Sequence, residues 1–263
     1  MLSWAFLTES PKEGMTQGGI FPAIFGTLVL VLLMSLATVP VGVITAIYLS
    51  EYSMGSIKFA KAIRFAVTNL AGVPSIVFGL FGLGFFIQFI GPMLDKLFSP
   101  QGEIIWNKPA LIWSAATLAI LTLPTVIVST EEALKNVPKE QREASFVLGA
   151  TRWQTIWRIV LPRAKSGVLT GTILAISRGA GEVAPILFTG AAFYLPTLPT
   201  SLSDQFMHLG YHLYIMATQS SNIQLTLPLQ YTTSIVLLVL VFGMNTAAIV
   251  VRSKFRKTLK HFG

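Results

Sequence analysis

Residues 20–49 read IFPAIFGTLVLVLLMSLATVPVGVITAIYL, a stretch without a single Asp, Glu, Lys or Arg. A helix of about 20 apolar residues is long enough to cross the ~30 Å hydrocarbon core of a bilayer, so this stretch predicts a membrane span. Four more stretches meet the same criterion: 65–90, 110–130, 167–190 and 231–251. Because only helices and closed barrels satisfy their backbone groups in lipid, the sequence predicts an all-α, multi-pass transmembrane helical bundle with five spans.

The composition excludes several classes of protein. Of the 263 residues, 53% are hydrophobic and 11% are charged, whereas a soluble domain averages about 25% charged residues. The chain has no Cys, which excludes disulfides, Cys-ligated zinc, iron–sulfur clusters and a thiol nucleophile. It also has no G-x-x-x-x-G-K-[ST] phosphate loop, the sequence signature of many nucleotide sites. We therefore expect no catalytic residues, no cofactor and no metal site, and neither a soluble enzyme nor a disordered chain.

The positions of the basic residues predict the orientation of the chain. Fifteen of the nineteen Lys and Arg residues fall in the segments 58–64, 135–165 and 252–260, which the five spans place on one side of the membrane. The opposite side has Lys12, Lys96 and Lys108. Because cytoplasmic loops carry the excess of Lys and Arg, the C-terminus is expected in the cytoplasm and the N-terminus of this chain outside. The net charge of +8 is then a topology signal, and no nucleic-acid partner is expected.

The cytoplasmic segment between the third and fourth spans, residues 138–162, has the pattern of two short helices joined by a glycine. Pro138 suits the first position of a helix, and Gly149 suits the left-handed residue that ends it. Thr151 and Gln154 have the spacing of a capping box for a second helix, which Pro162 is expected to end. From the residues alone, the apolar face of this hairpin suits two roles equally: docking into a groove of a partner or lying on lipid headgroups.

The spacing of seven residues in this segment resembles the EAA motif of ABC importer permeases. They are Glu143, Ala144, Ser145, Gly149, Ile159, Leu161 and Pro162. Ser145 is a departure, because it replaces the second alanine of the motif. The resemblance implies the type I ABC importer permease fold over 21–251, with 138–162 as the coupling segment that sits in a groove of a cytoplasmic ATPase. Residues 1–20 would form an external N-terminal tail and residues 252–263 a cytoplasmic basic tail.

Four other stretches resemble the A-type permeases of phosphate-specific transport systems: 70–82, 130–138, 177–185 and 211–231. The resemblance implies a subunit in the lipid bilayer of the cell membrane that translocates inorganic phosphate and leaves ATP hydrolysis to a partner. The implied partners are a second, homologous C-type permease, a cytoplasmic ABC ATPase dimer and an external phosphate-binding protein. The family usually has six spans, whereas this sequence shows five and lacks the first. Gly179 and Val183 also depart from the family, which tends to have Ala and Thr there.

Arg178 and Glu182 lie in the predicted fourth span, four residues apart and therefore on one face of a helix. Counted from Gly167 at ~1.5 Å per residue, Arg178 lies ~16 Å deep, near the midplane. A charge there costs at least ~2.5–3.5 kcal/mol. We favour a role on the substrate path, in which Arg178 binds phosphate through its guanidinium group and Glu182 holds Arg178 when substrate is absent. The alternative is an ion pair that only joins helices.

Other functions stay open from the sequence. They are a permease for another oxyanion such as molybdate or sulfate, a secondary transporter or channel that uses no ATP, and a regulatory or assembly protein. The coupling segment argues against the secondary transporter, which has no use for it. In the external segment 191–229, His208 and His212 have an i, i+4 spacing that suits a metal, but no third ligand is evident. We expect an interfacial or re-entrant helix over 202–217 instead.

Overall fold

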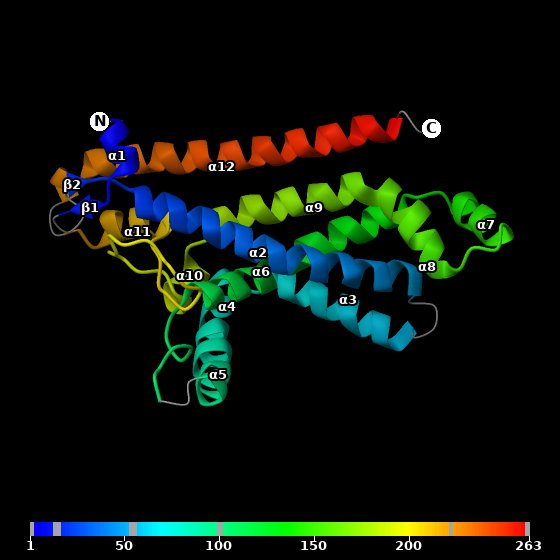
Figure 1. The fold of residues 1–263 in the computed structure, drawn as a ribbon, viewed down its shortest axis with the longest axis horizontal. Helices are drawn as coiled ribbons and strands as arrows, with labels where there is room; N and C mark the ends of the chain where they lie inside the picture. Colours follow the sequence, from blue (N-terminus) through cyan, green and yellow to red (C-terminus); the bar gives the residue numbers. More distant parts are fainter. Residues whose placement is uncertain (1–2, 13–16, 53–56, 99–101, 221–222, 261–263) are drawn as a thin grey trace. The chain divides into compact units, whose positions relative to one another are not determined.

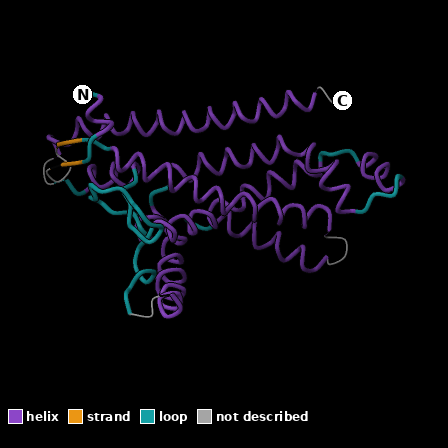
Figure 2. The backbone as a smooth tube through the Cα atoms, viewed as in Figure 1, coloured by secondary structure: helices purple, strands orange, loops and turns teal. Residues whose placement is uncertain are grey.

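The computed structural model describes residues 3–12, 17–52, 57–98, 102–220 and 223–260. Figure 2 shows that these residues are helical almost throughout, with one pair of short strands. The strands, β1 (Pro11–Lys12) and β2 (Gln17–Gly18), pair antiparallel, with Pro11 opposite Gly18. Apart from this hairpin, the predicted all-α class is confirmed.

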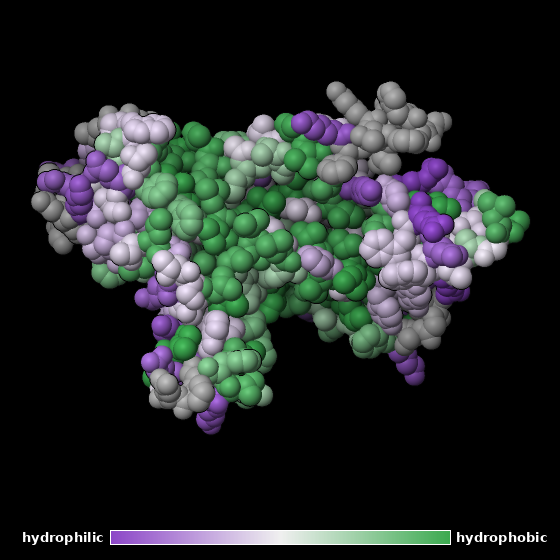
Figure 3. Space-filling model, viewed as in Figure 1, coloured by the Kyte–Doolittle hydropathy of each residue, from purple (hydrophilic) through white to green (hydrophobic). Residues whose placement is uncertain are grey.

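Five helical stretches of the described chain are long and apolar enough to cross a membrane, which confirms the predicted number. They are Phe21–Tyr52, Ser75–Phe98, Leu111–Lys135, Arg152–Gly181 and Thr226–Lys254. Many of their large apolar side chains are exposed, and Figure 3 shows a broad hydrophobic surface over the helices. A soluble protein rarely exposes so much apolar surface, so lipid or other membrane helices are the expected surroundings.

The chain divides into two compact units. The first comprises residues 1–34, 73–121 and 178–243, and the second comprises residues 35–72, 122–177 and 244–263. Four long helices contribute to both units: α2 (Phe21–Ile47), α6 (Leu111–Lys135), α9 (Leu161–Gly181) and α12 (Ile223–Lys260).

The remaining elements of the first unit are short helices and the β1–β2 hairpin (Figure 1). The helices are α1 (Trp4–Thr8), α4 (Ser75–Phe81), the π-helical η4 (Gly82–Ile90), α5 (Gly91–Phe98), α10 (Ala184–Thr189) and α11 (Leu209–Thr218). Because α4, η4 and α5 follow one another without a gap, they form one continuous span.

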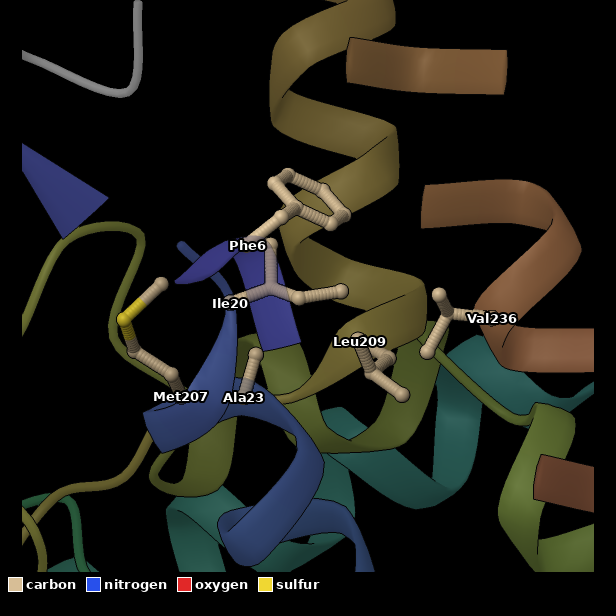
Figure 4. Close-up of a cluster of buried hydrophobic side chains, with 6 residues drawn as sticks. All are labelled: Phe6, Ile20, Ala23, Met207, Leu209 and Val236. Atoms are coloured by element: carbon tan, nitrogen blue, oxygen red, sulfur yellow. The ribbon is translucent and has the colours of Figure 1, made fainter. Parts of the chain in front are cut away.

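The segment 1–20 contains ordered structure, which the sequence analysis did not foresee. Its side chains join an apolar cluster of the first unit (Figure 4). The buried members of the cluster are Phe6, Ile20, Ala23, Met207, Leu209 and Val236. Burying a side chain such as Phe contributes roughly 1.5–3 kcal/mol. The N–H of Leu209 also donates to Oγ1 of the buried Thr27 at 3.0 Å. This hydrogen bond connects α2 to the start of α11.

The second unit contains the coupling segment and the helices around it. Its elements, besides parts of the long helices, are the π-helical η2 (Tyr48–Tyr52), α3 (Ile57–Gly72), α7 (Lys139–Val147), α8 (Arg152–Thr155) and the π-helical η5 (Ile156–Val160). One apolar cluster joins the ends of α2 and α6 to the start of α9. Its buried members are Ala46, Leu134, Val137, Val160 and Ala164.

An ion cluster joins α3 to α6 in the second unit. Oε1 of Glu131 lies 2.8 Å from both Nη2 of Arg64 and Nζ of Lys135. The Arg64 guanidinium also donates to the carbonyl of Leu49 at 2.9 Å. The carboxylate of Glu131 is nearly buried, so this cluster satisfies a charge that would be costly if left alone.

The second span begins later than predicted. The sequence indicated 65–90, but α3 ends at Gly72 and α4 begins at Ser75. Proline has no N–H for the carbonyl four residues earlier, and it disfavours helical geometry in the residue before it. Val73 and Pro74 therefore separate the two helices, and the span runs over Ser75–Phe98.

The fourth span differs from the predicted 167–190 at both ends. The helix starts at Arg152, stops after Gly181, and resumes as α10 with Pro185 in its first turn. Pro162 does not end the second helix of the hairpin, which was the prediction. The π-helical η5 precedes it, and the N–H of Leu161 donates to Ile156, five residues back. This shift in hydrogen-bond register lets the helix pass the proline without a break.

The ends of both predicted tails, residues 1–2 and 261–263, lie outside the described residues. The described part of the C-terminal tail continues α12 to Lys260.

Candidate functional site: the coupling segment and the charged pair

The coupling segment folds as the predicted helix–glycine–helix hairpin. α7 follows Pro138, and Gly149 has φ +81°, in the left-handed region that costs other residues roughly 1–2 kcal/mol. Oγ1 of Thr151 accepts the N–H of Gln154 at 3.3 Å, and Oε1 of Gln154 accepts the N–H of Thr151 at 2.9 Å. The predicted capping box is therefore confirmed, and it sets the direction of the second helix.

The turn of the hairpin exposes apolar side chains. Val147 and Leu148 are 86% and 87% exposed, and Glu143, Ala144 and Gly149 beside them are also exposed. Figure 3 shows a hydrophobic patch at this end of α7, with hydrophilic residues around it. We call these five residues the coupling tip. An exposed apolar patch with a polar rim is typical of an interaction surface.

Ser145 lies inside the hairpin and not at its surface. Its Oγ is 2.9 Å from Oγ1 of Thr155, and both residues are buried. This contact accounts for the departure from the alanine of the EAA motif, because the additional hydroxyl has a partner and carries no desolvation penalty. The serine thus links α7 to α8 within the hairpin.

Ile159, Leu161 and Pro162 do not belong to the coupling tip. They are half-buried where η5 continues into α9. Ile159 and Pro162 line a cavity of about 550 Å³, together with Val137 and Pro138 at the end of α6. Among the predicted coupling residues, the structure therefore exposes Glu143, Ala144 and Gly149 together. It buries Ser145 between α7 and α8 and places Ile159, Leu161 and Pro162 in the base of the hairpin.

Sequence reasoning missed Arg142, which connects the hairpin to the ends of two long helices. Its Nη2 donates to Oε1 of Glu51 at 2.9 Å and to the carbonyl of Leu134 at 2.7 Å. Its Nη1 donates to the carbonyl of Val137. Arg142 and Glu51 are 91 residues apart in sequence, and no local pattern indicates that they meet.

Arg178 and Glu182 form an ion pair, but they do not share a helix face as predicted, because α9 ends at Gly181 and Glu182 follows it. Nε of Arg178 lies 3.3 Å from Oε1 of Glu182, and the side chains are 39% and 19% exposed. Arg178 is in the last turn of α9, where the negative end of the helix dipole favours a cation. The midplane depth was counted from Gly167 and stays a prediction, whereas α9 begins at Leu161. From Leu161, Arg178 lies ~26 Å along the helix at ~1.5 Å per residue.

The break after Gly181 leads into a closely packed junction of the first unit. A Cβ on Gly79 of α4 would lie 3.0 Å from the carbonyl oxygen of Ala184 and 3.0 Å from Cα of Pro185. A side chain at this position would require the backbone of α10 to shift, so glycine suits this approach of α4 to α10. The junction brings together the two sequence stretches 70–82 and 177–185. Sequence analysis identified both stretches but gave no sign of their contact.

The segment 191–229, which is predicted to be external, contains a shorter helix than predicted. α11 begins at Leu209 instead of 202, because Asp204 accepts the N–H groups of Thr200 and Ser201 at 2.9 and 2.8 Å and holds the preceding residues in a loop. These bonds lower the pKa of Asp204. Nδ1 of His208 accepts the N–H of Tyr211 at 3.4 Å, which caps the helix. Within the described ranges, no three His, Asp or Glu residues gather into a metal site.

Both histidines of this segment are buried, and this makes stability depend on pH. Burial lowers the pKa of His208 and of His212 from 6.5 to about 4. Between pH 6.5 and pH 4 the unfolded chain binds more protons at these histidines than the folded chain does. The free energy of unfolding therefore has its full value above pH 6.5 and falls as the pH drops towards 4. We expect a loss of roughly 1–2 kcal/mol per histidine between pH 7 and pH 5.

Thermal unfolding of the purified protein in detergent at pH 5.0 to 7.5 measures this dependence. In the His208→Gln/His212→Gln variant, the decrease in unfolding temperature on acidification should be much smaller than in the wild type. An unchanged decrease in the double variant would assign the effect to other groups.

Comparison with known proteins places the fold and the coupling segment in a family. Residues 38–257 match the family described as "Binding-protein-dependent transport system inner membrane component". The chain belongs to this family. The match covers all of the second unit's coupling segment and extends through the charged pair.

This inner membrane component has relatives with a more specific description. It is 42% identical over 170 residues to the phosphate transport system permease protein PstA of Mycobacterium leprae, covering 65% of this chain and 50% of the relative. It is 38% identical over 206 residues to PstA of Yersinia pestis, covering 78% of this chain and 60% of the relative. The chain thus spans about half of the length of the first of these curated relatives.

The fold also matches solved ABC importers. A structure of the MetNI methionine ABC transporter in inward-facing conformations aligns with a TM-score of 0.67 at 16% identity, covering 89% of this chain and 94% of that one. A bacterial ABC transporter involved in alginate import aligns with a TM-score of 0.60 at 19% identity, covering 93% and 82%. The predicted type I ABC importer permease fold is therefore confirmed.

Proposed function

We propose that this chain is the membrane-spanning permease subunit of an ATP-driven importer and that it translocates inorganic phosphate across the cytoplasmic membrane. The observation that carries the proposal is the coupling tip. Val147 and Leu148 are apolar, almost fully exposed and held at a fixed turn by Gly149, as a surface that docks into a groove requires. The PstA relatives support phosphate as the substrate.

The proposed partners supply the chemistry that this chain lacks. The sequence contains no phosphate loop, so a cytoplasmic ABC ATPase dimer hydrolyses ATP and this subunit is not an enzyme. A second, homologous C-type permease completes the pathway, and an external phosphate-binding protein delivers the substrate. The fifteen basic residues on the side of the coupling segment support a cytoplasmic location for it and for the C-terminus, and an external location for the N-terminus of this chain.

The proposed mechanism converts ATPase closure into movement of the spans. Closure displaces the coupling tip, the rigid hairpin transfers the displacement to α6 and α9, and the pathway opens alternately to each side. Arg178 lies on this pathway and binds the phosphate oxygens through charge-assisted hydrogen bonds, and Glu182 takes the guanidinium when substrate leaves. The non-helical residues between α9 and α10 are compatible with a pathway here, because irregular backbone at membrane depth occurs where it is buried in protein or lines a water-filled cavity.

ATP hydrolysis in reconstituted vesicles tests the proposal. The chain is assembled with the second permease, the ATPase and the binding protein, and ATP hydrolysis is measured with phosphate, sulfate or molybdate outside. We expect phosphate alone to stimulate hydrolysis several-fold. Stimulation by molybdate or sulfate instead would overturn the substrate assignment, and failure of the chain to bind any ATPase would overturn the importer assignment.

A further inference from the structure

The coupling hairpin meets the spans at two places: α8 continues through η5 into α9 as one helix, whereas α7 reaches α6 through a short non-helical connection. The outer face of α7, which includes Glu143, Ala144 and Val147, is exposed. Asn136, Val137 and Pro138 join α7 to the end of α6 through the backbone. A short backbone connection bends easily, so it does not by itself transmit a push from the tip.

Arg142 supplies a stiffer connection. Its guanidinium contacts three acceptors on two other elements: the carboxylate of Glu51 in η2 and the carbonyls of Leu134 and Val137 at the end of α6. The planar guanidinium fork fixes the direction of each bond. The carbonyls at a helix C-terminus also carry the negative end of the dipole and attract the cation. One side chain of α7 therefore holds the ends of α2 and α6 together.

Burial makes this contact costly to break. The side chains of Arg142 and Glu51 are 15% and 14% exposed, and Oγ of Ser50 donates to the same carboxylate oxygen at 3.1 Å. Removing one partner from such a buried pair leaves the other charge without compensation. The apolar cluster of Ala46, Leu134 and Val137 lies at the same helix ends, so the contact joins segments that are already packed together.

We propose that Arg142 is the positioning residue through which movement of the coupling hairpin reaches the C-terminal ends of α2 and α6. This inference rests on the proposed function, because it needs an ATPase that moves α7. In this assignment Glu51 and the α6 carbonyls receive the movement, and the Ser145–Thr155 contact keeps α7 and α8 together as one body while they move.

Arg64 offers a matched control of the same chemistry. Its guanidinium also contacts one carboxylate, Glu131, and one backbone carbonyl, that of Leu49. It joins α3 to α6 and does not touch α7. An Arg64→Met variant therefore loses a similar set of bonds without affecting the proposed connection.

The test compares Arg142→Met and Arg64→Met in the reconstituted full complex. We expect Arg142→Met to retain the ATPase partner and basal ATP hydrolysis. The factor by which the loaded binding protein stimulates ATP hydrolysis should fall at least tenfold. Arg64→Met should keep the stimulation ratio even where its unfolding temperature is lower. Wild-type stimulation in Arg142→Met would overturn the inference, as would loss of the ATPase partner or an equal loss of stimulation in Arg64→Met. Absence of stimulation in the wild-type complex would instead overturn the proposed function.

A crosslink separates a positioning role from a merely structural one. The natural chain has no cysteine, so a thiol-directed crosslinker of suitable length can be placed between Glu51→Cys and Arg142→Cys. We expect the double variant to be uncoupled, to regain stimulation on crosslinking with a reducible reagent, and to lose it again on reduction. Each single-cysteine variant should show no recovery. Failure of the crosslinked double variant to recover would overturn the assignment of Arg142 as a mechanical connection.

Discussion

Arg178→Gln is expected to reduce phosphate uptake at least ~30-fold while the subunit still reaches the membrane and assembles. Glutamine has a similar reach but no charge, so it cannot make charge-assisted bonds to the substrate oxygens. Each hydrogen bond that the guanidinium donates to a charged oxygen contributes ~1.5–3 kcal/mol, the fork can donate two, and each ~1.4 kcal/mol corresponds to a factor of ten. Uptake of labelled phosphate by vesicles with equal amounts of assembled complex measures the effect.

Glu182→Gln provides the control for this prediction. It breaks the same ion pair of 3.3 Å but leaves the guanidinium in place. If Arg178 binds substrate, Glu182→Gln keeps a substantial part of the uptake, whereas a purely structural pair gives equal losses in both variants. Uptake at the wild-type rate in Arg178→Gln would remove this residue from the substrate path.

The number and type of the spans are predictable because they follow from composition over long windows. The stretch 20–49 predicted a helix that the structure places at Phe21–Tyr52, and the stretch 110–130 corresponds to Leu111–Lys135. Prolines limited the accuracy at the other spans. Pro74 breaks its helix, whereas Pro162 lies in the first turn of α9 and Pro124 and Pro228 lie inside α6 and α12. A proline in the sequence therefore does not tell by itself whether a helix ends there.

The local geometry of the coupling hairpin was predictable, and its contacts were not. Gly149 and the pair Thr151–Gln154 act through neighbouring backbone groups, so their spacing carries the information. The contacts of Arg142 with Glu51 and of Ser145 with Thr155 depend on how distant segments pack. The spacing of the EAA motif likewise gave no indication that Val147 and Leu148 are almost fully exposed.

Leu148→Glu is expected to prevent stable binding of the ATPase partner. Leu148 is 87% exposed, so the folded subunit tolerates the change without loss of packing. In the complex, the same side chain is expected in an apolar groove, where an unpaired carboxylate is desolvated. Central anchors of this kind contribute at least ~2 kcal/mol, so we expect an affinity loss of at least ~30-fold. Co-purification of the ATPase with the detergent-solubilised subunit measures the loss.

Ile104→Glu is the matched control, because Ile104 is an exposed aliphatic residue in the loop between α5 and α6, outside the coupling segment. Both variants add one negative charge to an exposed aliphatic position. A difference in ATPase binding between them is therefore caused by the position of the substitution and not by the added charge. Ile104→Glu should retain the ATPase, and both variants should unfold at the wild-type temperature. An unpaired carboxylate in a closed apolar groove would lower the affinity for the ATPase measurably. Retention of the ATPase by Leu148→Glu at wild-type affinity would therefore show that the coupling tip is not the docking surface.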